Sequence, residues 1–229
     1  KKDKMKVIYH GLNYQYKPLK KKKIIQILKK LKINQNKEFF MHVGSNEWYK
    51  NKIGVLKIFL NLVKKFRLDI NLVLVSSSAF SGATLKIEDE LKNFATKNKI
   101  INRLFILKDI SNYELSGIYS GSNGLIFPSF IEGAGLPVIE AQACGCPVFA
   151  SNRPPMTEYA GNGAIFFDPQ KHSLAARKIF NNIKNIDALK KKGFENILKF
   201  SKNNFNFSYI EIYNNIIKNY NITKNKKKV

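Results

Sequence analysis

Two carboxylates flank a glycine-containing stretch that could bind a diphosphate. Glu132 and Glu140 are separated by seven residues, and Gly133-Ala134-Gly135-Leu136-Pro137 between them joins an expected strand end to an expected helix. Proline near the first helical position is preorganised for a helix and lacks an amide hydrogen that it would not use. Glycines let backbone amides approach a ligand closely. The stretch therefore predicts a helix N-terminus with bare amides, which favours a phosphate group.

Each glutamate has two interpretations. Glu140 lies in an otherwise apolar helix, where a carboxylate is rarely fully buried unless it is paired. It either points at a cleft and accepts hydroxyl hydrogen bonds, or it is a buried carboxylate satisfied by neighbouring backbone. Glu132 is either part of the same site or a solvated loop acid. The combined pattern, E-G-x-G-L-P-x-x-E at a strand–helix junction, is far more specific than either half.

A second loop, residues 44–52, could add positive charge to such a site. Gly44 ends an apolar run, and Lys50 and Lys52 lie near an expected helix N-terminus, where an anion is favoured. Neither GxxxxGK[ST] nor GxGxxG occurs in it. Taken alone, the loop fits an ordinary strand-to-helix connection with solvated lysines better than a phosphate site.

Alternating strand and helix patterns must position these two loops. Expected strands cover 38–43, 70–75, 104–107, 124–127, 147–150 and 164–167. Expected helices cover 54–66, 84–98, 111–119 and 136–143, followed by helical stretches near 171–185, 187–201 and 208–220. Ser111 and Glu114 have capping-box spacing. The alternation predicts an α/β fold, a Rossmann-like parallel sheet with helices on both faces, whose ligands bind at the carboxyl ends of the strands.

The first 36 residues differ from the rest. They predict an extended arm to about Tyr16 and a lysine-rich helix over 17–32, with 12 lysines in residues 1–32 against the single acid Asp3. Residues 37–229 are then the Rossmann-like domain. Because Lys1 and not Met stands first, we expect the chain to be a piece of something longer.

Composition excludes several classes of protein. A hydrophobic fraction of 44% is typical of a globular chain. No apolar run reaches the roughly 18 residues of a spanning helix, which excludes an integral membrane protein. Cys144 and Cys146 cannot build a disulfide framework, and they indicate a reducing, cytosolic setting and small buried residues better than a metal site. The three histidines lack metal-ligand spacing, so we expect no metal and no cofactor.

The net charge of +24 has two explanations. An anionic partner, such as nucleic acid or a membrane surface, is one. Codon bias is the other, because 36 of the 40 basic residues are lysine and the chain is rich in Ile and Asn, whose codons are also rich in A and T. Nucleic-acid-binding proteins usually recruit arginine, so composition favours codon bias and no nucleic acid. A peripheral contact of residues 17–32 with the inner membrane face remains the alternative.

Residues 127–150 (FPSFIEGAGLPVIEAQACGCPVFA) strongly resemble the donor-binding motif of the retaining GT-B glycosyltransferases of family 4 (group 1). The resemblance extends along the chain. The interdomain linker of the family is matched by residues 8–13, and its first phosphate-contacting loop by residues 42–52. The strand and helix that flank the base pocket are matched by residues 104–120, and the segment after the motif by residues 151–169. The resemblance implies the C-terminal, nucleotide-sugar-binding half of a GT-B fold, without its N-terminal acceptor domain. It implies metal-free transfer of a sugar, with retention, from a nucleotide-diphosphate sugar to a glycan or lipid-linked acceptor.

The resemblance also assigns residues by position. Glu132 matches the catalytic glutamate beside the donor sugar, and Glu140 the glutamate that binds the ribose hydroxyls. Lys50 matches the lysine that neutralises the diphosphate. The remaining contacts to the sugar and phosphates fall on Gly44, Ser45, Gly133, Ala134, Gly135 and Leu136.

Two departures and two competing functions stand beside this assignment. Many members carry Arg where this chain has Ser45, and Phe where it has Ala134, which puts one phosphate contact and the shape of the sugar pocket in doubt. The competing functions are a nucleotide-sugar epimerase of the same fold and a basic nucleic-acid-binding protein.

Overall fold

The computed structural model describes residues 5–76 and 83–226, and in them six parallel strands form one sheet. The strands are β1 (Phe39–Val43), β2 (Asn71–Ser76), β3 (Leu104–Lys108), β4 (Gly124–Phe127), β5 (Val148–Ser151) and β6 (Ala164–Phe167). Their order in the sheet is β3-β2-β1-β4-β5-β6, so the order reverses between β1 and β4. In β1, Phe40 pairs with Leu72 on one side and with Gly124 on the other. Ligands of such sheets bind outside the carboxyl ends of the strands at this reversal.

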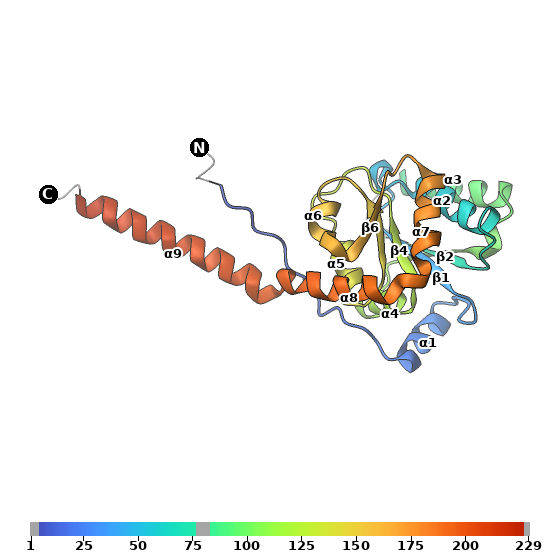
Figure 1. The fold of residues 1–229 in the computed structure, drawn as a ribbon, viewed down its shortest axis with the longest axis horizontal. Helices are drawn as coiled ribbons and strands as arrows, with labels where there is room; N and C mark the ends of the chain where they lie inside the picture. The colour runs from blue at the N-terminus through green and yellow to red at the C-terminus, as the bar shows by residue number, and fades with distance from the viewer. Residues whose placement is uncertain (1–4, 77–82, 227–229) are drawn as a thin grey trace.

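Helices cover both faces of the sheet, as the alternating pattern predicts (Figure 1). They are α1 (Lys21–Lys30), α2 (Lys52–Lys64), α3 (Ala83–Lys97), α4 (Asn112–Gly121), α5 (Leu136–Ala143), α6 (Met156–Ala160), α7 (His172–Asn182), α8 (Ile186–Ile197) and α9 (Lys202–Lys226). Successive β1 residues point to opposite faces. Phe39 and Met41 belong to the core shared with α4 and α5, whereas Phe40 belongs to the core shared with α2, α3 and α7. The expected α/β, Rossmann-like architecture is therefore confirmed.

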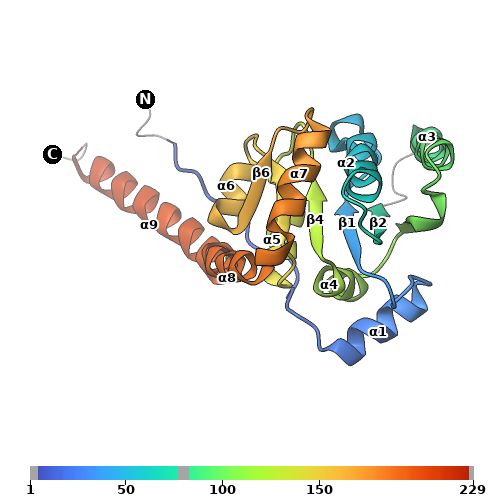
Figure 2. The same cartoon turned by 45° about the vertical axis from the view of Figure 1, so that its right-hand side comes forward.

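The lysine-rich helix α1 is part of this packing. Ile27 and Leu28 are buried against the α4 side of the sheet (Figure 2). Gly117 of α4 permits the close approach, because a Cβ at that position would overlap Ile27. Cys144 and Cys146 are buried free thiols, as expected.

Four helices differ from the sequence prediction. α1 begins at Lys21 and not at Lys17, because the backbone is still extended at Lys20 (ψ 144°). α2 begins at Lys52 and not Gly54 because Asn51 caps it. α6 was not predicted, since five residues after Pro155 are too short to show helical periodicity. α9 extends well beyond the expected 208–220. Its first turn is rich in Asn, which has a low helix propensity, so the sequence predicts a later start. The helix begins earlier because the Ser201 hydroxyl caps it by accepting a hydrogen bond from the Asn204 amide. The capping box of Ser111 and Glu114 is confirmed.

Residues 5–12 of an extended arm run beside the first half of α9, and both lead away from the sheet (Figures 1 and 2). The arm then returns to the sheet, where Tyr16 is buried in the core. Lys6 Nζ lies 2.6 Å from Glu211 Oε2, the His10 ring stacks on Phe205, and the Leu12 amide donates to the Phe200 carbonyl at 3.2 Å. Within residues 5–76 and 83–226, no helix combines the length and the hydropathy needed to cross a membrane.

Candidate functional site

The two loops singled out in the sequence meet at the point where the strand order reverses. One follows β1 and the other follows β4, and these strands are neighbours in the sheet. Lys50 Nζ lies 2.6 Å from Glu132 Oε2, and the two side chains are only 15% and 6% exposed. The interpretations of Glu132 as a solvated loop acid and of Lys50 as a solvated lysine are therefore wrong. The reason is that each shields and neutralises the other.

Asn51 fixes the position of Lys50. It adopts a left-handed conformation (φ 53°), and its side-chain oxygen accepts a hydrogen bond from the Gly54 amide at the start of α2. Its Nδ2 donates to the carbonyls of Pro128 and Pro169, at 3.0 and 3.3 Å. One side chain thus caps a helix and ties the loop after β1 to the loops after β4 and β6.

Lys52 also helps to order the loop after β1. Its Nζ donates to Asn46 Oδ1 and to Ser76 Oγ, both at 2.6 Å, and the residue is 4% exposed. Burial lowers the pKa of Lys52 to about 8. Like Lys50, Lys52 is not the solvated lysine that the loop alone predicts. Its ammonium group is held by hydrogen bonds to a residue after β1 and to the last residue of β2.

Gly44 and Ser45 begin the same loop. The Gly44 amide donates to the Val75 carbonyl of β2 at 3.0 Å. A Cβ at Gly44 would lie 3.3 Å from His42 Nε2 and 3.4 Å from the aliphatic part of Lys50, so a side chain there would press on both. Ser45 is half-buried beside it.

The start of α5 has the open amides that the sequence predicts. Gly135 occupies the N-cap position with a φ of 72°, a conformation that favours glycine, and no side chain caps the helix. Gly133 is exposed, and a Cβ there would meet nothing within 4 Å. Ala134 and Leu136 pack against a small apolar cluster that includes Tyr159. This N-terminus is therefore available to an anion next to Glu132.

Glu140 is a buried acid with a side-chain partner. It is 9% exposed, and Oε2 accepts a hydrogen bond from the Tyr119 hydroxyl of α4 at 3.1 Å. Burial raises the pKa of Glu140 to about 7, although the Tyr119 hydrogen bond opposes this. The hydrogen bond to Glu140 therefore comes from the Tyr119 phenol of the neighbouring helix. The interpretation that neighbouring backbone satisfies this carboxylate is wrong.

Among residues 5–76 and 83–226, four buried polar atoms at the carboxyl ends of β1, β4 and β5 have no hydrogen-bond partner: His42 Nε2, Ser129 Oγ, Glu132 Oε1 and Ser151 Oγ. His42 Nδ1 lies 2.9 Å from the Ile126 carbonyl, which fixes the proton on Nδ1 and leaves Nε2 as an acceptor. Burial and the charge of Lys52 lower the pKa of His42 to about 3. Unpartnered polar atoms are rare inside proteins and mark this edge as chemically unusual.

Sequence reasoning missed Asn51, His42 and Ser129 as parts of this arrangement. Asn51 had a visible signal, since asparagine directly before an apolar helical pattern predicts an N-cap. His42 and Ser129 had none, because their surroundings depend on which strands are neighbours.

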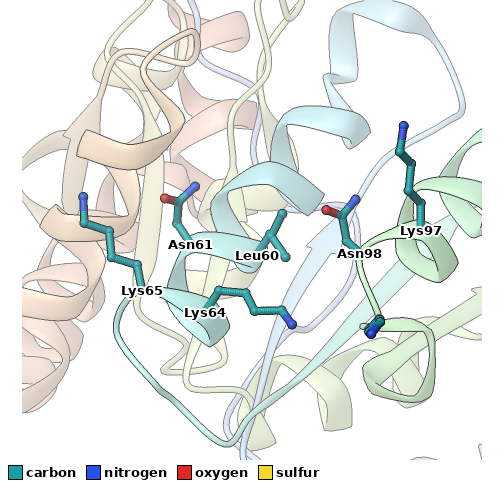
Figure 3. Close-up of a pocket in the computed structure, with 7 residues that line it drawn as sticks. Leu60, Asn61, Lys64, Lys65, Lys97 and Asn98 are labelled. Atoms are coloured by element: carbon teal, nitrogen blue, oxygen red, sulfur yellow. The ribbon is translucent and has the colours of Figure 1, made fainter.

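A separate hollow of about 500 Å³ lies where α2 and α3 end, at the opposite edge of the sheet. Figure 3 shows lysine and asparagine side chains around it. The lining residues are Leu60, Asn61, Lys64, Lys65, Lys97, Asn98 and Lys99. It is positively charged and holds none of the residues that the sequence assigned to the site.

The family model of glycosyl transferases group 1 matches residues 23–199. The chain belongs to this family. This group 1 glycosyl transferase chain is 31% identical over 190 residues to the O-antigen chain mannosyltransferase RfbU of Salmonella typhimurium, which covers 82% of the chain and 45% of that protein. It is 30% identical over 131 residues to the O-antigen chain mannosyltransferase B of Escherichia coli, covering 57% and 33%. The chain spans less than half the length of these two relatives.

Solved structures match the fold of this group 1 glycosyl transferase chain. The glycosyltransferase from Rickettsia africae superposes with a TM-score of 0.84 at 21% identity, covering 96% of this chain and 59% of that one. HepE of Anabaena, solved in complex with UDP-glucose, superposes with a TM-score of 0.79 at 17% identity, covering 92% and 57%. At these identities the likeness shows the α/β fold alone.

Proposed function

We propose that this chain is the C-terminal, nucleotide-sugar-binding half of a retaining glycosyltransferase of family 4. The whole enzyme transfers a sugar from a nucleotide-diphosphate sugar to a glycan or lipid-linked acceptor. The observation that carries this proposal is the buried Lys50–Glu132 pair beside the uncapped N-terminus of α5. The family membership and the solved complex of HepE with UDP-glucose support it.

Lys50 and the α5 amides are the groups that stabilise the leaving diphosphate. In the described structure Lys50 is held by Glu132 Oε2 at 2.6 Å. A diphosphate bound at Gly133–Leu136 would share the ammonium group with Glu132. Preorganised donors aimed at developing charge are usually the largest single contribution to catalysis. Gly44 and Ser45 line the same loop and add the remaining contacts.

Glu132 orients the donor sugar and stabilises positive charge as it develops on the sugar ring. Its Oε1 atom is buried and without a partner, so it is free to accept a hydrogen bond from a sugar hydroxyl. Lys50 holds the other oxygen, which fixes the carboxylate plane. We do not assign Glu132 as a covalent nucleophile. Retention instead requires the acceptor hydroxyl to be held against the reacting carbon, and such positioning supplies much of the rate.

Glu140 accepts hydrogen bonds from the ribose hydroxyls of the nucleotide. Its pKa of about 7 keeps a substantial fraction ionised at neutral pH, and ionised carboxylates are strong acceptors. The Tyr119 hydroxyl occupies one of its oxygens and fixes the rotamer.

The acceptor half lies in sequence that this chain does not contain. We infer this from the relatives, which are more than twice as long as the matched region. The arm and α9 lie outside the matched residues 23–199 and leave the sheet together, so we assign them to the connection with that half. We place the enzyme in the cytoplasm.

The competing functions are less well supported. The family model and the two mannosyltransferase relatives favour transfer over epimerisation and over nucleic-acid binding. An epimerase would need an acid–base histidine next to the sugar, and His42 is locked as a neutral buried acceptor.

Calorimetry with UDP, GDP and ADP, each with and without an attached sugar, tests the proposal. We expect weak binding of one of these ligands, because half of the cleft is missing, and no efficient sugar transfer by this chain alone. Lys50→Ala should abolish the heat, whereas Lys57→Ala, an exposed lysine of α2, should leave it unchanged. The absence of heat and of thermal stabilisation with every ligand would contradict the proposal.

A further inference from the structure

The single tryptophan of the chain lies on the surface at the edge of this site. Trp48 follows β1 and is 68% exposed. Tyr49 and Phe130 pack against it, and Arg153 lies over the Phe130 ring; the three come from the loops after β1, β4 and β5. We call these four residues the aromatic platform.

The platform is held in a fixed arrangement. The Trp48 ring packs edge-on against Tyr49 at 5.9 Å and tilted against Phe130 at 6.3 Å. The guanidinium of Arg153 lies 5.4 Å from the centre of the Phe130 ring. The Phe130 amide donates to the Tyr49 carbonyl at 2.8 Å, which joins the two loops through their main chains. A surface tryptophan supported in this way presents its free face to solvent with little conformational freedom to lose on binding.

The platform is continuous with the proposed donor site. Lys50 Nζ lies 5.4 Å from the centre of the Tyr49 ring while it pairs with Glu132. The Lys50–Glu132 pair is buried, whereas Trp48 is exposed, so the platform forms the outer rim and the charged pair the interior. Ile131, 57% exposed, extends this apolar rim up to Glu132.

We infer that the aromatic platform binds the acceptor saccharide, by stacking one face of a sugar ring on Trp48. This inference rests on the proposed function and adds, from this chain, one contact with the acceptor to those that the acceptor half supplies. One face of a pyranose ring carries C–H groups that suit the electron-rich face of an aromatic ring. The ring edge carries hydroxyls, for which the Arg153 guanidinium supplies N–H donors. The donor sugar belongs to the interior beside Glu132, so a saccharide on the rim approaches it as the acceptor must.

Saturation-transfer NMR of the chain with millimolar linear mannotetraose tests the inference, with Trp48 fluorescence as a second readout. We expect saccharide signals and a fluorescence change in the wild-type chain. Trp48→Ala should weaken saccharide binding about two- to ten-fold, the scale of an aromatic stacking contact. Trp48→Phe should restore most of it. Phe207→Ala, which removes an equally exposed ring (67%) from α9, should have no effect.

Calorimetry with UDP and GDP on the same variants separates this inference from the proposed function. Nucleotide binding that persists in Trp48→Ala while saccharide binding falls supports both. Wild-type chain that binds nucleotide but gives no saccharide signals, or equal loss in Trp48→Ala and Phe207→Ala, overturns the platform and leaves the proposed function standing. If Trp48→Ala fails to fold, an unchanged wild-type fluorescence on adding saccharide overturns the platform as well.

Discussion

Glu140 is a carboxylate in surroundings that disfavour its charge. Burial raises its pKa to about 7 from an ordinary value near 4.5. The folded state therefore binds this proton more tightly than the unfolded chain does. The resulting stabilisation is fully present below about pH 4.5 and is lost as the pH rises through 7. Above that pH the ligand-free fold carries the cost of a buried charge, which a nucleotide ribose would offset by donating hydrogen bonds.

Glu140→Gln should consequently change stability and binding in opposite directions. At pH 8 we expect weaker nucleotide binding by about 1–3 kcal/mol, the scale of a charge-assisted hydrogen bond. We also expect a higher Tm of the ligand-free variant than of the wild type at pH 8, with the difference shrinking at pH 5. Calorimetry and thermal unfolding at both pH values measure this.

A 2′,3′-dideoxy nucleotide is the matched control for Glu140. It should bind the wild type as poorly as the ribonucleotide binds Glu140→Gln. A variant that is less stable than the wild type at pH 8 would instead show that Glu140 is a structural carboxylate.

The Lys50–Glu132 pair should behave as a coupled unit. Lys50→Met leaves the Glu132 carboxylate buried without its counter-charge, and Glu132→Gln removes the counter-charge of Lys50. We expect each single change to lower the free energy of unfolding by about 1–3 kcal/mol. The double variant should lose less than the sum, because it leaves no unpaired charge. Urea unfolding of the four proteins measures the coupling, and additive losses would mean that the two side chains do not stabilise the fold through each other.

At the scale of elements, the loop after β1 depends on one asparagine. Asn51 combines a left-handed backbone, the cap of α2 and the two hydrogen bonds to Pro128 and Pro169. Losing an N-cap costs about 0.5–2 kcal/mol, and a left-handed alanine adds about 1–2 kcal/mol. We expect Asn51→Ala to be less stable than Asn51→Gly by about 1 kcal/mol in urea unfolding, since glycine keeps the backbone conformation. Both should weaken nucleotide binding because the Lys50 loop loses its anchor; equal stability would show that the backbone conformation is unimportant there.

The central strands β2, β4 and β5 could be predicted from the sequence because they are buried on both faces. The runs that become β2 and β4 contain almost no polar residue, so their boundaries were predicted to within a residue. α6 and the first turn of α9 could not be predicted, because tertiary packing and a side-chain cap, and not periodicity, stabilise them.

The site was only partly predictable for a related reason. The glycines and the proline at the start of α5 predict a helix N-terminus from local sequence alone. The Lys50–Glu132 contact joins residues 82 positions apart and exists only because β1 and β4 are neighbours. The alternation of strands and helices predicts a parallel sheet but not its strand order. The interaction partners of His42, Lys50 and Lys52 therefore could not be predicted from the sequence.

At the scale of the whole molecule, the charge of +24 remains to be explained. The exposed lysines Lys20–Lys23 precede or begin α1, and four more lysines line the hollow between α2 and α3. If the charge serves membrane docking, only one of these two groups of lysines should be needed for binding to lipid. If the charge results from codon bias, the lysines of both groups are simply solvated and bind no membrane.

Two quadruple variants with the same change in charge test this. One converts Lys20–Lys23 to Gln, and the other converts Lys64, Lys65, Lys97 and Lys99 to Gln. We expect no sedimentation of the wild-type chain with vesicles of anionic lipid at physiological salt, in agreement with codon bias. Sedimentation that needs anionic lipid and is lost only in the Lys20–Lys23 variant would instead establish docking through α1. A salt titration with duplex DNA checks the nucleic-acid alternative, since phosphate contacts give a steep dependence on salt.

The position of β1 in the middle of the sheet also has a consequence for biosynthesis. β2 can pair with β1 soon after it is made, but β4, the other neighbour, ends 84 residues after β1 does. At roughly 5–20 residues per second, the ribosome leaves one edge of β1 open for about 4–17 s. That edge belongs to a strand in which four of the five residues are apolar, the kind of template on which nascent chains aggregate. We therefore expect β1 to be the segment that a chaperone protects, and the ligand site to be among the last parts of the fold to form.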